Sequence, residues 1–376
     1  MEHYLDNSAT TRVCPEAAEA ALRAMTEIYG NPSSTHTLGR EAKKQLDLSR
    51  KQAADALGCL PKELVFTSCG SESDNWAILG GAEAMKRRGK HVISSAVEHD
   101  AVRKSLDELE SRGFEVTRLR PDRTGAIPVE AVREALRPDT VLLSLMLVNN
   151  ETGAVTDIPG ISRLLRETGS PALLHCDAVQ AFLKLPFTAK SLGADLISVS
   201  GHKIHAPKGV GALYIRNGLR LKPFILGGGQ EDGRRAGTEA MPQIAAFGAA
   251  CALGSAHLGE NAARMTDCKR EIVRRLSAAI PELRFVDTAA PHILSLSLPG
   301  YRSEVLMNFL EAREVYVSKS SACKKGGRSH VLEAIGLEAR TIDGAIRVGL
   351  SRCTTAGDID ALCQGLIDAH ESLRHA

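Results

Sequence analysis

The feature that most constrains the fold is a repeated alternation of short apolar runs with amphipathic stretches of helical period. Helical patterns, for example over 72–88 and 100–112, separate these runs. Strands that alternate with helices of about four turns are typical of βαβ units, and they predict a mainly parallel sheet covered by helices. A further strand is expected over 209–215, and an antiparallel edge position is one option for it. The apolar runs lie at 64–67, 91–95, 114–117, 141–147, 172–176 and 194–199.

The length of the chain predicts more than one domain. At 376 residues it exceeds what one typical hydrophobic core supports. A nearly unbroken helical pattern over 239–280 suits a long helical connection between two domains. After Pro281 the sequence pattern changes to short strands and few helices. We therefore expect an N-terminal arm (1–15) that packs with the small domain, a large domain (16–255) and a small α+β C-terminal domain (256–376).

Charge and cysteine content exclude several classes of protein. The balance of 47 basic against 45 acidic residues gives a formal charge of +2, too weak a field to favour nucleic acid or an anionic membrane as partner. No apolar run reaches the length of a membrane span, and the first residues lack the pattern of a signal peptide, so a cytoplasmic protein is expected. The 9 cysteines include no CxxC pair, so neither a disulfide framework nor a metal site is predicted.

Lys203 is the first candidate for chemistry, because it follows a buried strand directly in the sequence Ser198-Val199-Ser200-Gly201-His202-Lys203. A lysine that is partly desolvated at a strand end loses part of its preference for the ammonium form, and its free amine can then form a Schiff base with a carbonyl. Taken alone, the same residue also fits a surface lysine that opens a loop.

Polar residues follow the other predicted strands too, and ligands of open α/β sheets bind beyond these carboxyl ends. Gly70 and Ser71 open a helix and form a candidate phosphate site, although an ordinary helix cap would look the same. His99 follows the second strand. Asp177 stands behind a buried strand and would need a partner such as a protonated ring nitrogen, or a capping role. Together, these groups and Lys203 are the set of side chains and backbone groups that binds pyridoxal 5′-phosphate (PLP).

Ordered motifs along the whole chain resemble those of the cysteine desulfurases, in the class V aminotransferase group of PLP enzymes. The resemblance implies the type I fold of PLP-dependent transferases, whose large domain holds a mainly parallel sheet of seven strands. The motifs are Tyr4 through Thr11, Gly30 through Ser34, Phe66 through Asn75, Glu98-His99, Val148 through Glu151, Asp177 through Gln180, Ser200 through Lys203, Arg235 through Thr238 and Ser321-Ala322-Cys323.

The resemblance also implies the roles of single residues. Lys203 would bind the cofactor covalently, Asp177 would hold the pyridine nitrogen, and His99 would stack on the ring and move protons. The remaining roles are the ring hydroxyl (Asn150, Gln180), the phosphate (Gly70, Ser71, Ser200, His202, and Thr238 from the other subunit of a homodimer) and the substrate carboxylate (Arg352, with Asn31 and Asn150 near it).

Cys323 decides between a desulfurase and other PLP enzymes. It lies in a Gly- and Lys-rich segment, 319–328, that contains cations and no acid, and such surroundings favour the reactive thiolate. The expected reaction removes sulfur from L-cysteine, leaves a persulfide on Cys323 and releases alanine. The sulfur would then pass to an acceptor or scaffold protein for iron–sulfur assembly or for thiolation of tRNA or a cofactor.

Other readings stay open at this point. An aminotransferase would not need Cys323, and a selenocysteine lyase would prefer the selenium substrate. A catalytically silent protein of the same fold that binds partners is a third alternative, although Lys203, Asp177 and Cys323 are all present.

Overall fold

A computed structural model describes residues 2–286, 288–320 and 327–373. Its centre is a seven-stranded sheet with the order β2-β8-β7-β6-β5-β3-β4. β8 runs antiparallel to both of its neighbours, and the other neighbouring pairs are parallel, which confirms the mainly parallel sheet. In sheet order the strands are β2 (Leu64–Thr67), β8 (Gly211–Ile215), β7 (Leu196–Ser200), β6 (Leu173–Asp177), β5 (Thr140–Met146), β3 (His91–Ser95) and β4 (Glu115–Leu119).

The edge position considered for the strand over 209–215 is wrong. β8 pairs with β7 on one side and with β2 on the other, so β2 forms this edge of the sheet. All residues of β8 are buried. The local sequence shows only that this strand is apolar, whereas its inner position depends on β2, which lies far earlier in the chain.

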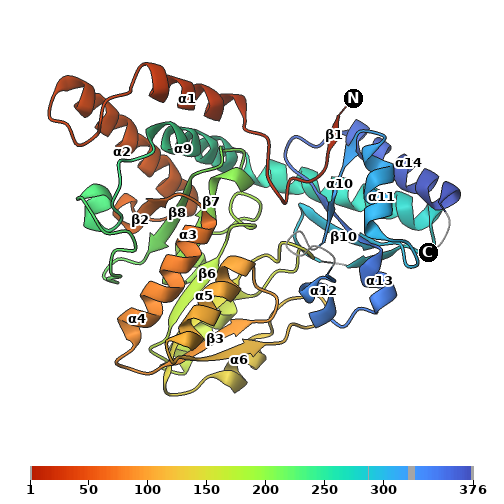
Figure 1. Ribbon diagram of the computed structural model, residues 1–376, viewed down its shortest axis with the longest axis horizontal. Coiled ribbons are helices and arrows are strands. Elements are labelled where there is room, and N and C mark those ends of the chain that lie inside the picture. Colours follow the sequence, from red (N-terminus) through yellow and green to blue (C-terminus); the bar gives the residue numbers. More distant parts are fainter. Residues whose placement is uncertain (1, 287, 321–326, 374–376) are drawn as a thin grey trace.

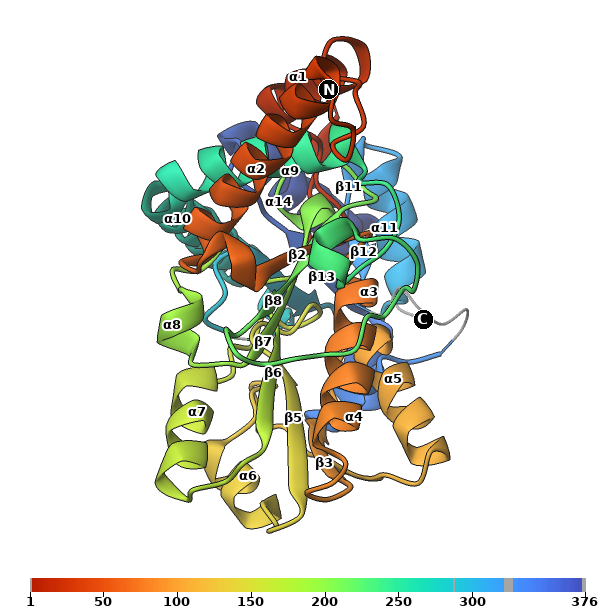
Figure 2. The same cartoon turned by 90° about the vertical axis from the view of Figure 1, so that its left-hand side faces the viewer.

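Helices cover both faces of the sheet (Figures 1 and 2). One face packs against α3 (Gly70–Asn75), α4 (Gly81–Met85) and α5 (Asp100–Ser111), and a π-helical turn over Trp76–Gly80 joins the first two of these. The other face carries the largest hydrophobic cluster. Its helices are α1 (Pro15–Thr26), α2 (Thr37–Leu57), α6 (Val129–Ala135), α7 (Ile158–Glu167), α8 (Ala189–Leu192) and α9 (Met241–Ala256).

A second, antiparallel sheet lies in the C-terminal part, with the order β12-β13-β10-β9. A separate hydrophobic cluster fills the space between this sheet and its helices. The N-terminal strand β1 (His3–Tyr4) pairs in parallel with β11 (Val315–Tyr316), so the N-terminal segment lies beside the C-terminal sheet. The remaining elements are α10 (Leu258–Ala279), β9 (Arg284–Val286), β10 (Ile293–Ser297), α11 (Ser303–Glu311), β12 (Ser318–Lys319), α12 (His330–Ala334), α13 (Ala339–Asp343), β13 (Ala345–Gly349) and α14 (Ala356–Ser372).

The nearly unbroken helix expected over 239–280 has an interruption at His257. α9 ends at Ala256 and α10 begins at Leu258, and His257 between them has φ −119° and ψ 18°. α9 packs against α1 and α2, whereas α10 packs against α14. The break therefore falls where the chain passes from one hydrophobic cluster to the other.

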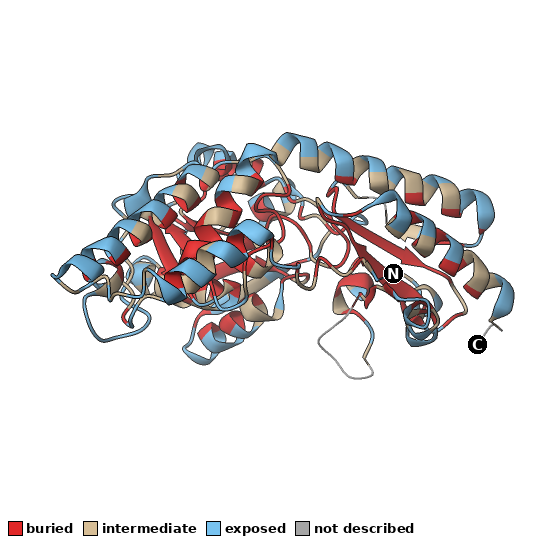
Figure 3. Ribbon diagram, turned by 90° about the horizontal axis from the view of Figure 1, so that it is seen from above, coloured by how far each residue is buried: buried red, intermediate tan, exposed pale blue. Residues whose placement is uncertain are grey.

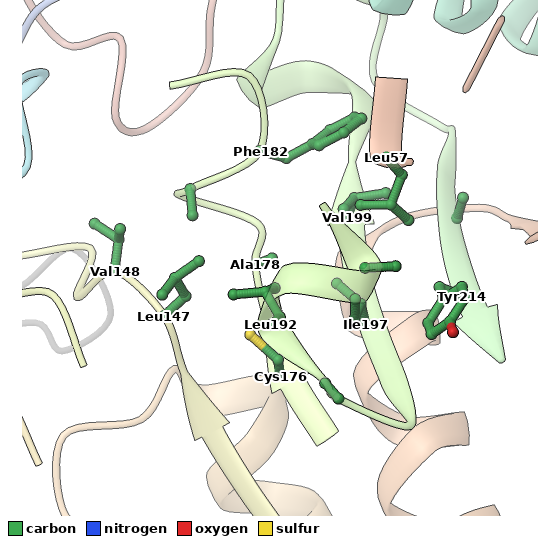
Figure 4. Packing of buried hydrophobic residues seen from close by; sticks show 14 of the residues in the cluster. Leu57, Leu147, Val148, Cys176, Ala178, Phe182, Leu192, Ile197, Val199 and Tyr214 are labelled. Carbon is green, nitrogen blue, oxygen red and sulfur yellow. The ribbon is translucent and has the colours of Figure 1, made fainter. Parts of the chain in front are cut away.

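Burial follows this division into layers. The inner strands are buried, the edge strands β4 and β9 are partly exposed, and most helices expose their outer faces (Figure 3). Figure 4 shows residues from distant segments in the largest cluster, among them Leu57 at the end of α2, Phe182, and Val199 in β7. Within the described residues, no helix combines the length and apolar composition that a bilayer span requires.

Candidate active site

A cavity of about 400 Å³ opens at the carboxyl ends of the parallel strands, where ligands of such sheets bind. Strand-end residues of β3, β5, β6 and β7 contribute to its wall, together with the start of α3 and the N-terminal segment. Most of the residues predicted to form the site line this one cavity: Gly70, Ser71, His99, Asn150, Asp177, Gln180, Ser200, His202 and Lys203.

Lys203 enters the cavity from a short 3₁₀ turn, Gly201–Lys203, directly after β7. Its Nζ donates hydrogen bonds to the carbonyl oxygens of Ser8 and Ala9, both at 2.7 Å. Burial, with a further contribution from the nearby Arg347 guanidinium, lowers the pKa of Lys203 to about 7. A large fraction of this lysine is therefore a free amine at neutral pH, as Schiff-base chemistry requires.

Asp177 is the last residue of β6 and is buried. Its Oδ1 accepts a hydrogen bond from the Val179 N–H at 2.9 Å, and it forms no ion pair with a residue that the structure describes. Burial raises the pKa of this carboxyl. A protonated ring nitrogen would supply the missing cation, so the donor set fits the pyridine ring of PLP.

The start of α3 fits a phosphate group. A Cβ atom on Gly70 would lie 2.8 Å from Val179 Cγ2 and 3.4 Å from Ser200 Cβ, so this position has room for backbone only. Within the described part of the chain, the buried Ser200 hydroxyl has no hydrogen-bond partner, and Cys69 before the helix makes no capping bond with its side chain. The cradle thus offers free backbone and hydroxyl donors, which is the chemistry that holds phosphate.

His202 lies beside this cradle, and its Nδ1 is 3.2 Å from Thr10 Oγ1. Burial and the neighbouring Lys203 lower the pKa of His202 to about 4, so its ring is neutral at physiological pH. A neutral imidazole can still donate one hydrogen bond to an anion.

His99 and Asn150 come from two turns that meet above neighbouring strands. His99 caps α5, and its Nδ1 accepts a hydrogen bond from the Ala101 N–H at 3.1 Å, which leaves the neutral ring with its hydrogen on Nε2. The Asn150 carbonyl accepts from Arg347 Nη1 at 2.7 Å. Gln180 Nε2 donates to the Ser8 carbonyl at 2.9 Å and so ties the N-terminal segment to the site.

The structure does not bring Arg352 to the cavity. Arg352 lies in a separate, small cavity with Lys184 and His205. Arg347, in β13, lines the main cavity instead and is 3% exposed. Its guanidinium also contacts Asp6 Oδ1 at 3.2 Å. Arg347 was not predictable from the sequence, because both arginines are close to the same predicted strand. Only the tertiary pairing of β13 decides which of them faces the large sheet.

Two further predicted residues, Asn31 and Thr238, are not part of this cavity. Asn31 and Thr238 are exposed and do not line it. The Asn31 side chain accepts a hydrogen bond from the Ser33 N–H at 2.9 Å within its own turn. Cys323 lies outside the described residues.

The cavity also contains residues that lie within the motifs but were given no role from the sequence. Ser8 and Ala9 contribute backbone carbonyls, for which a sequence carries no signal. Asp74, Glu98 and Glu151 are buried carboxyl groups in the wall. Their positions in segments that follow strands were a usable signal. Their burial was not predictable from residue type, because acidic residues are usually exposed.

Comparison with known proteins identifies the family. Residues 3–362 match the family model described as "Aminotransferase class-V". The chain is 40% identical over 377 residues to "Cysteine desulfurase IscS" of Methanosarcina thermophila, with 99% of this chain and 93% of the relative covered. It is also 40% identical over 376 residues to a "Cysteine desulfurase" of Trichormus azollae, with the same shares covered.

Solved structures agree with the sequence relatives. A "NIFS-LIKE PROTEIN" superimposes with a TM-score of 0.94 at 34% identity, and the match covers 99% of this chain and 100% of the other. The protein in "SspA in complex with cysteine" matches with a TM-score of 0.81 at 33% identity, over 94% of this chain and 100% of the other. The chain belongs to the aminotransferase class-V family and, within it, to the cysteine desulfurases that use pyridoxal phosphate.

Proposed function

We propose that this chain removes the sulfur atom of L-cysteine at the cavity lined by Lys203 and Asp177, and that it passes the sulfur to Cys323. The observation that carries this proposal is the joint position of Lys203, Asp177 and the Gly70 cradle in one cavity. Bound there, PLP would supply an electron sink for the negative charge that develops on the substrate Cα.

Lys203 has two tasks in this proposal. As a free amine it would hold the cofactor covalently, and its Nζ, when not bound to the cofactor, would be the base that takes the Cα proton of the substrate. Its lowered pKa of about 7 matches a general base that works near neutral pH. His99, with a hydrogen on Nε2, is a second group that can move a proton in the same cavity.

Arg347 is the proposed partner of the substrate carboxylate, in place of Arg352. It is buried in the wall of the cavity, and no described residue forms a hydrogen bond with its Nε. A guanidinium binds a carboxylate through paired N–H donors. The bond from Arg347 Nη1 to the Asn150 carbonyl fixes this arginine against the turn that carries Asn150.

Sulfur transfer is assigned to Cys323 on the basis of the family resemblance and the cationic segment around it. The Cys323 thiolate attacks the sulfur of the bound substrate. The S–S bond forms as the substrate C–S bond breaks, and the electron pair of that bond stays on the carbon skeleton, which takes up a proton and leaves as alanine. The persulfide is then available to an acceptor or scaffold protein, for iron–sulfur assembly or for thiolation of tRNA or a cofactor.

We also propose a cytoplasmic homodimer, in which Thr238 reaches the phosphate site of the partner subunit. Thr238 is exposed and away from the cavity of its own chain. Large apolar side chains are exposed on α1 and in several other segments, and such surfaces often mark interfaces. They include Leu22 (56% exposed), Met25 (55%), Tyr29 (65%) and Leu226 (82%). Sedimentation analysis of the PLP-loaded protein should give twice the chain mass.

The assignment of Lys203 can be tested by fixing the cofactor covalently. Borohydride treatment of the PLP-loaded protein, followed by peptide mass analysis, should find the reduced cofactor on the peptide that contains Lys203. Lys184 is a matched control, because it is also buried and burial lowers its pKa to about 8, but it lies outside the cavity. Labelling should survive Lys184→Met and be lost in Lys203→Ala, and labelling of Lys184 would contradict the assignment.

A further inference from the structure

The turns that carry His99 and Asn150 are held together by buried side chains. β3 and β5 are parallel neighbours, so their carboxyl ends lie side by side. Glu98, next to His99, accepts a hydrogen bond at Oε1 from the Met146 N–H across the two strand ends, at 3.2 Å. Asn149, next to Asn150, donates from Nδ2 to the Val97 carbonyl at 3.0 Å. Glu98 and Asn149, each adjacent to a proposed site residue, thus connect the two segments by hydrogen bonds to the backbone of the opposite segment.

Glu98 lies in surroundings that suit a neutral carboxylic acid. It is 1% exposed, and its buried Oε2 has no hydrogen-bond partner among the residues that the structure describes. Its Oε1 accepts a second hydrogen bond, from Ser95 Oγ at 2.5 Å, so a proton on Glu98 belongs on Oε2. An ionised carboxylate with one oxygen buried and unpaired is costly, whereas a carboxylic acid is much less so.

The charges around Glu98 point in the same direction. Asp177 at the end of β6 and Asp74 on α3 are buried carboxyls in the same wall, and the cations of this wall are Lys203, Arg347 and, nearer the surface, Arg103. His99 also faces the cavity. Burial first, and then the Asp177 carboxylate, raise the pKa of Glu98 to about 8. Burial raises the pKa of Asp177 as well, and the hydrogen bond from the Val179 N–H opposes that rise.

We propose that Glu98 is a positioning residue that acts as a neutral carboxylic acid and fixes the turn of His99 against the turn of Asn150. This inference rests on the proposed roles of His99 and Asn150. Glu98 Oε1 accepts hydrogen bonds from Ser95 and from Met146. The neutral acid places no negative charge beside Asp177, the carboxyl that is proposed to hold the ring nitrogen. Glu98 itself does not touch the reacting atoms.

The test compares an isosteric neutral side chain with an apolar one. Glu98→Gln keeps a carbonyl acceptor for Ser95 and Met146 and resembles the protonated acid, whereas Glu98→Leu removes the acceptor. In the PLP-loaded enzyme, Glu98→Leu should lower kcat/KM for L-cysteine by at least about tenfold, and Glu98→Gln should restore it to within about threefold of the parent. Ser95→Ala is a matched control, since it removes one bond to Oε1 but leaves the bond between the turns.

Two readouts separate this role from general damage to the fold. The visible circular dichroism of the bound cofactor reports the asymmetry of its surroundings, and it should change in Glu98→Leu and persist in Glu98→Gln. The infrared difference spectrum between the parent apoprotein and Glu98→Gln at pH 7 should contain the C=O stretch of a protonated carboxyl. If Glu98→Gln is as impaired as Glu98→Leu, or if the difference spectrum contains only carboxylate bands, the proposal is overturned.

A His99→Gln variant distinguishes failure of the proposed function from failure of this inference. If that variant keeps the activity and the dichroism of the parent, the role proposed for His99 is wrong. The protonation state of Glu98 is then still decided by the infrared measurement, which needs neither cofactor nor activity.

Discussion

The choice between Arg347 and Arg352 as carboxylate partner gives a quantitative prediction. Arg347 is 3% exposed in the wall of the cavity, and Arg352 lies in a different cavity. Removal of one partner of a buried, hydrogen-bonded charge pair typically costs about 2–5 kcal/mol, which corresponds to a loss of about 30-fold to several thousand-fold in kcat/KM. We expect a loss in this range for Arg347→Gln and less than about threefold for Arg352→Gln.

The assay measures alanine formation against L-cysteine concentration for both variants and for Arg347→Lys. Lysine keeps the charge but loses the paired donors, so it should recover part of the loss. Arg347 also pairs with Asp6, so thermal unfolding and cofactor absorbance must first show that the variant folds and binds PLP. Equal losses in the two glutamine variants, or a larger loss in Arg352→Gln, would refute the reasoning.

Three other predictions concern stability, pH and the phosphate cradle. The buried pair of Arg50 and Glu231 (2.6 Å) links α2 to the 3₁₀ turn Gln230–Gly233, and Arg50→Met should lower the free energy of unfolding in urea by about 3–5 kcal/mol. Arg23→Met, which breaks an exposed pair, should change it by less than about 1 kcal/mol, and similar values for both would contradict this account. Between pH 7 and 10.5, the ordinary pKa of lysine, the folded apoprotein binds fewer protons at Lys203 than the unfolded chain does. The stability of the parent relative to Lys203→Met should therefore rise with pH across that window. A stability difference that does not change with pH would be inconsistent with a lowered pKa of Lys203. Gly70→Ala places a Cβ atom 2.8 Å from Val179 Cγ2 and should weaken PLP binding measured by absorbance titration, whereas unchanged affinity would argue against the cradle.

The layers of the fold and most of the site were predictable because their signals are local. Each parallel strand is an apolar run, and the residues after such runs meet at one edge of the sheet by topology alone. This is why Lys203, Asp177 and Gly70 could be placed together before the structure was known, and the structure brings all three into one cavity.

The features that were not predicted from the sequence depend on pairings between distant segments. β8 became an inner strand because β2 adds to it, and Arg347 faces the cavity because β13 pairs with β10 and β12 in one register. The carbonyls of Ser8 and Ala9 reach Lys203 only after the N-terminal segment has paired with the C-terminal part. None of these facts has a signature within a short window of sequence.

The most direct test of the account is the mass of the peptide that contains Cys323 after brief exposure of the PLP-loaded protein to L-cysteine without reductant. The account predicts a gain of one sulfur atom on that peptide, accompanied by alanine, and no gain in Lys203→Ala. If cysteine is consumed with the cofactor bound and the Cys323 peptide gains no sulfur, Cys323 is not the acceptor, and the aminotransferase or lyase alternatives replace the desulfurase mechanism proposed for this site.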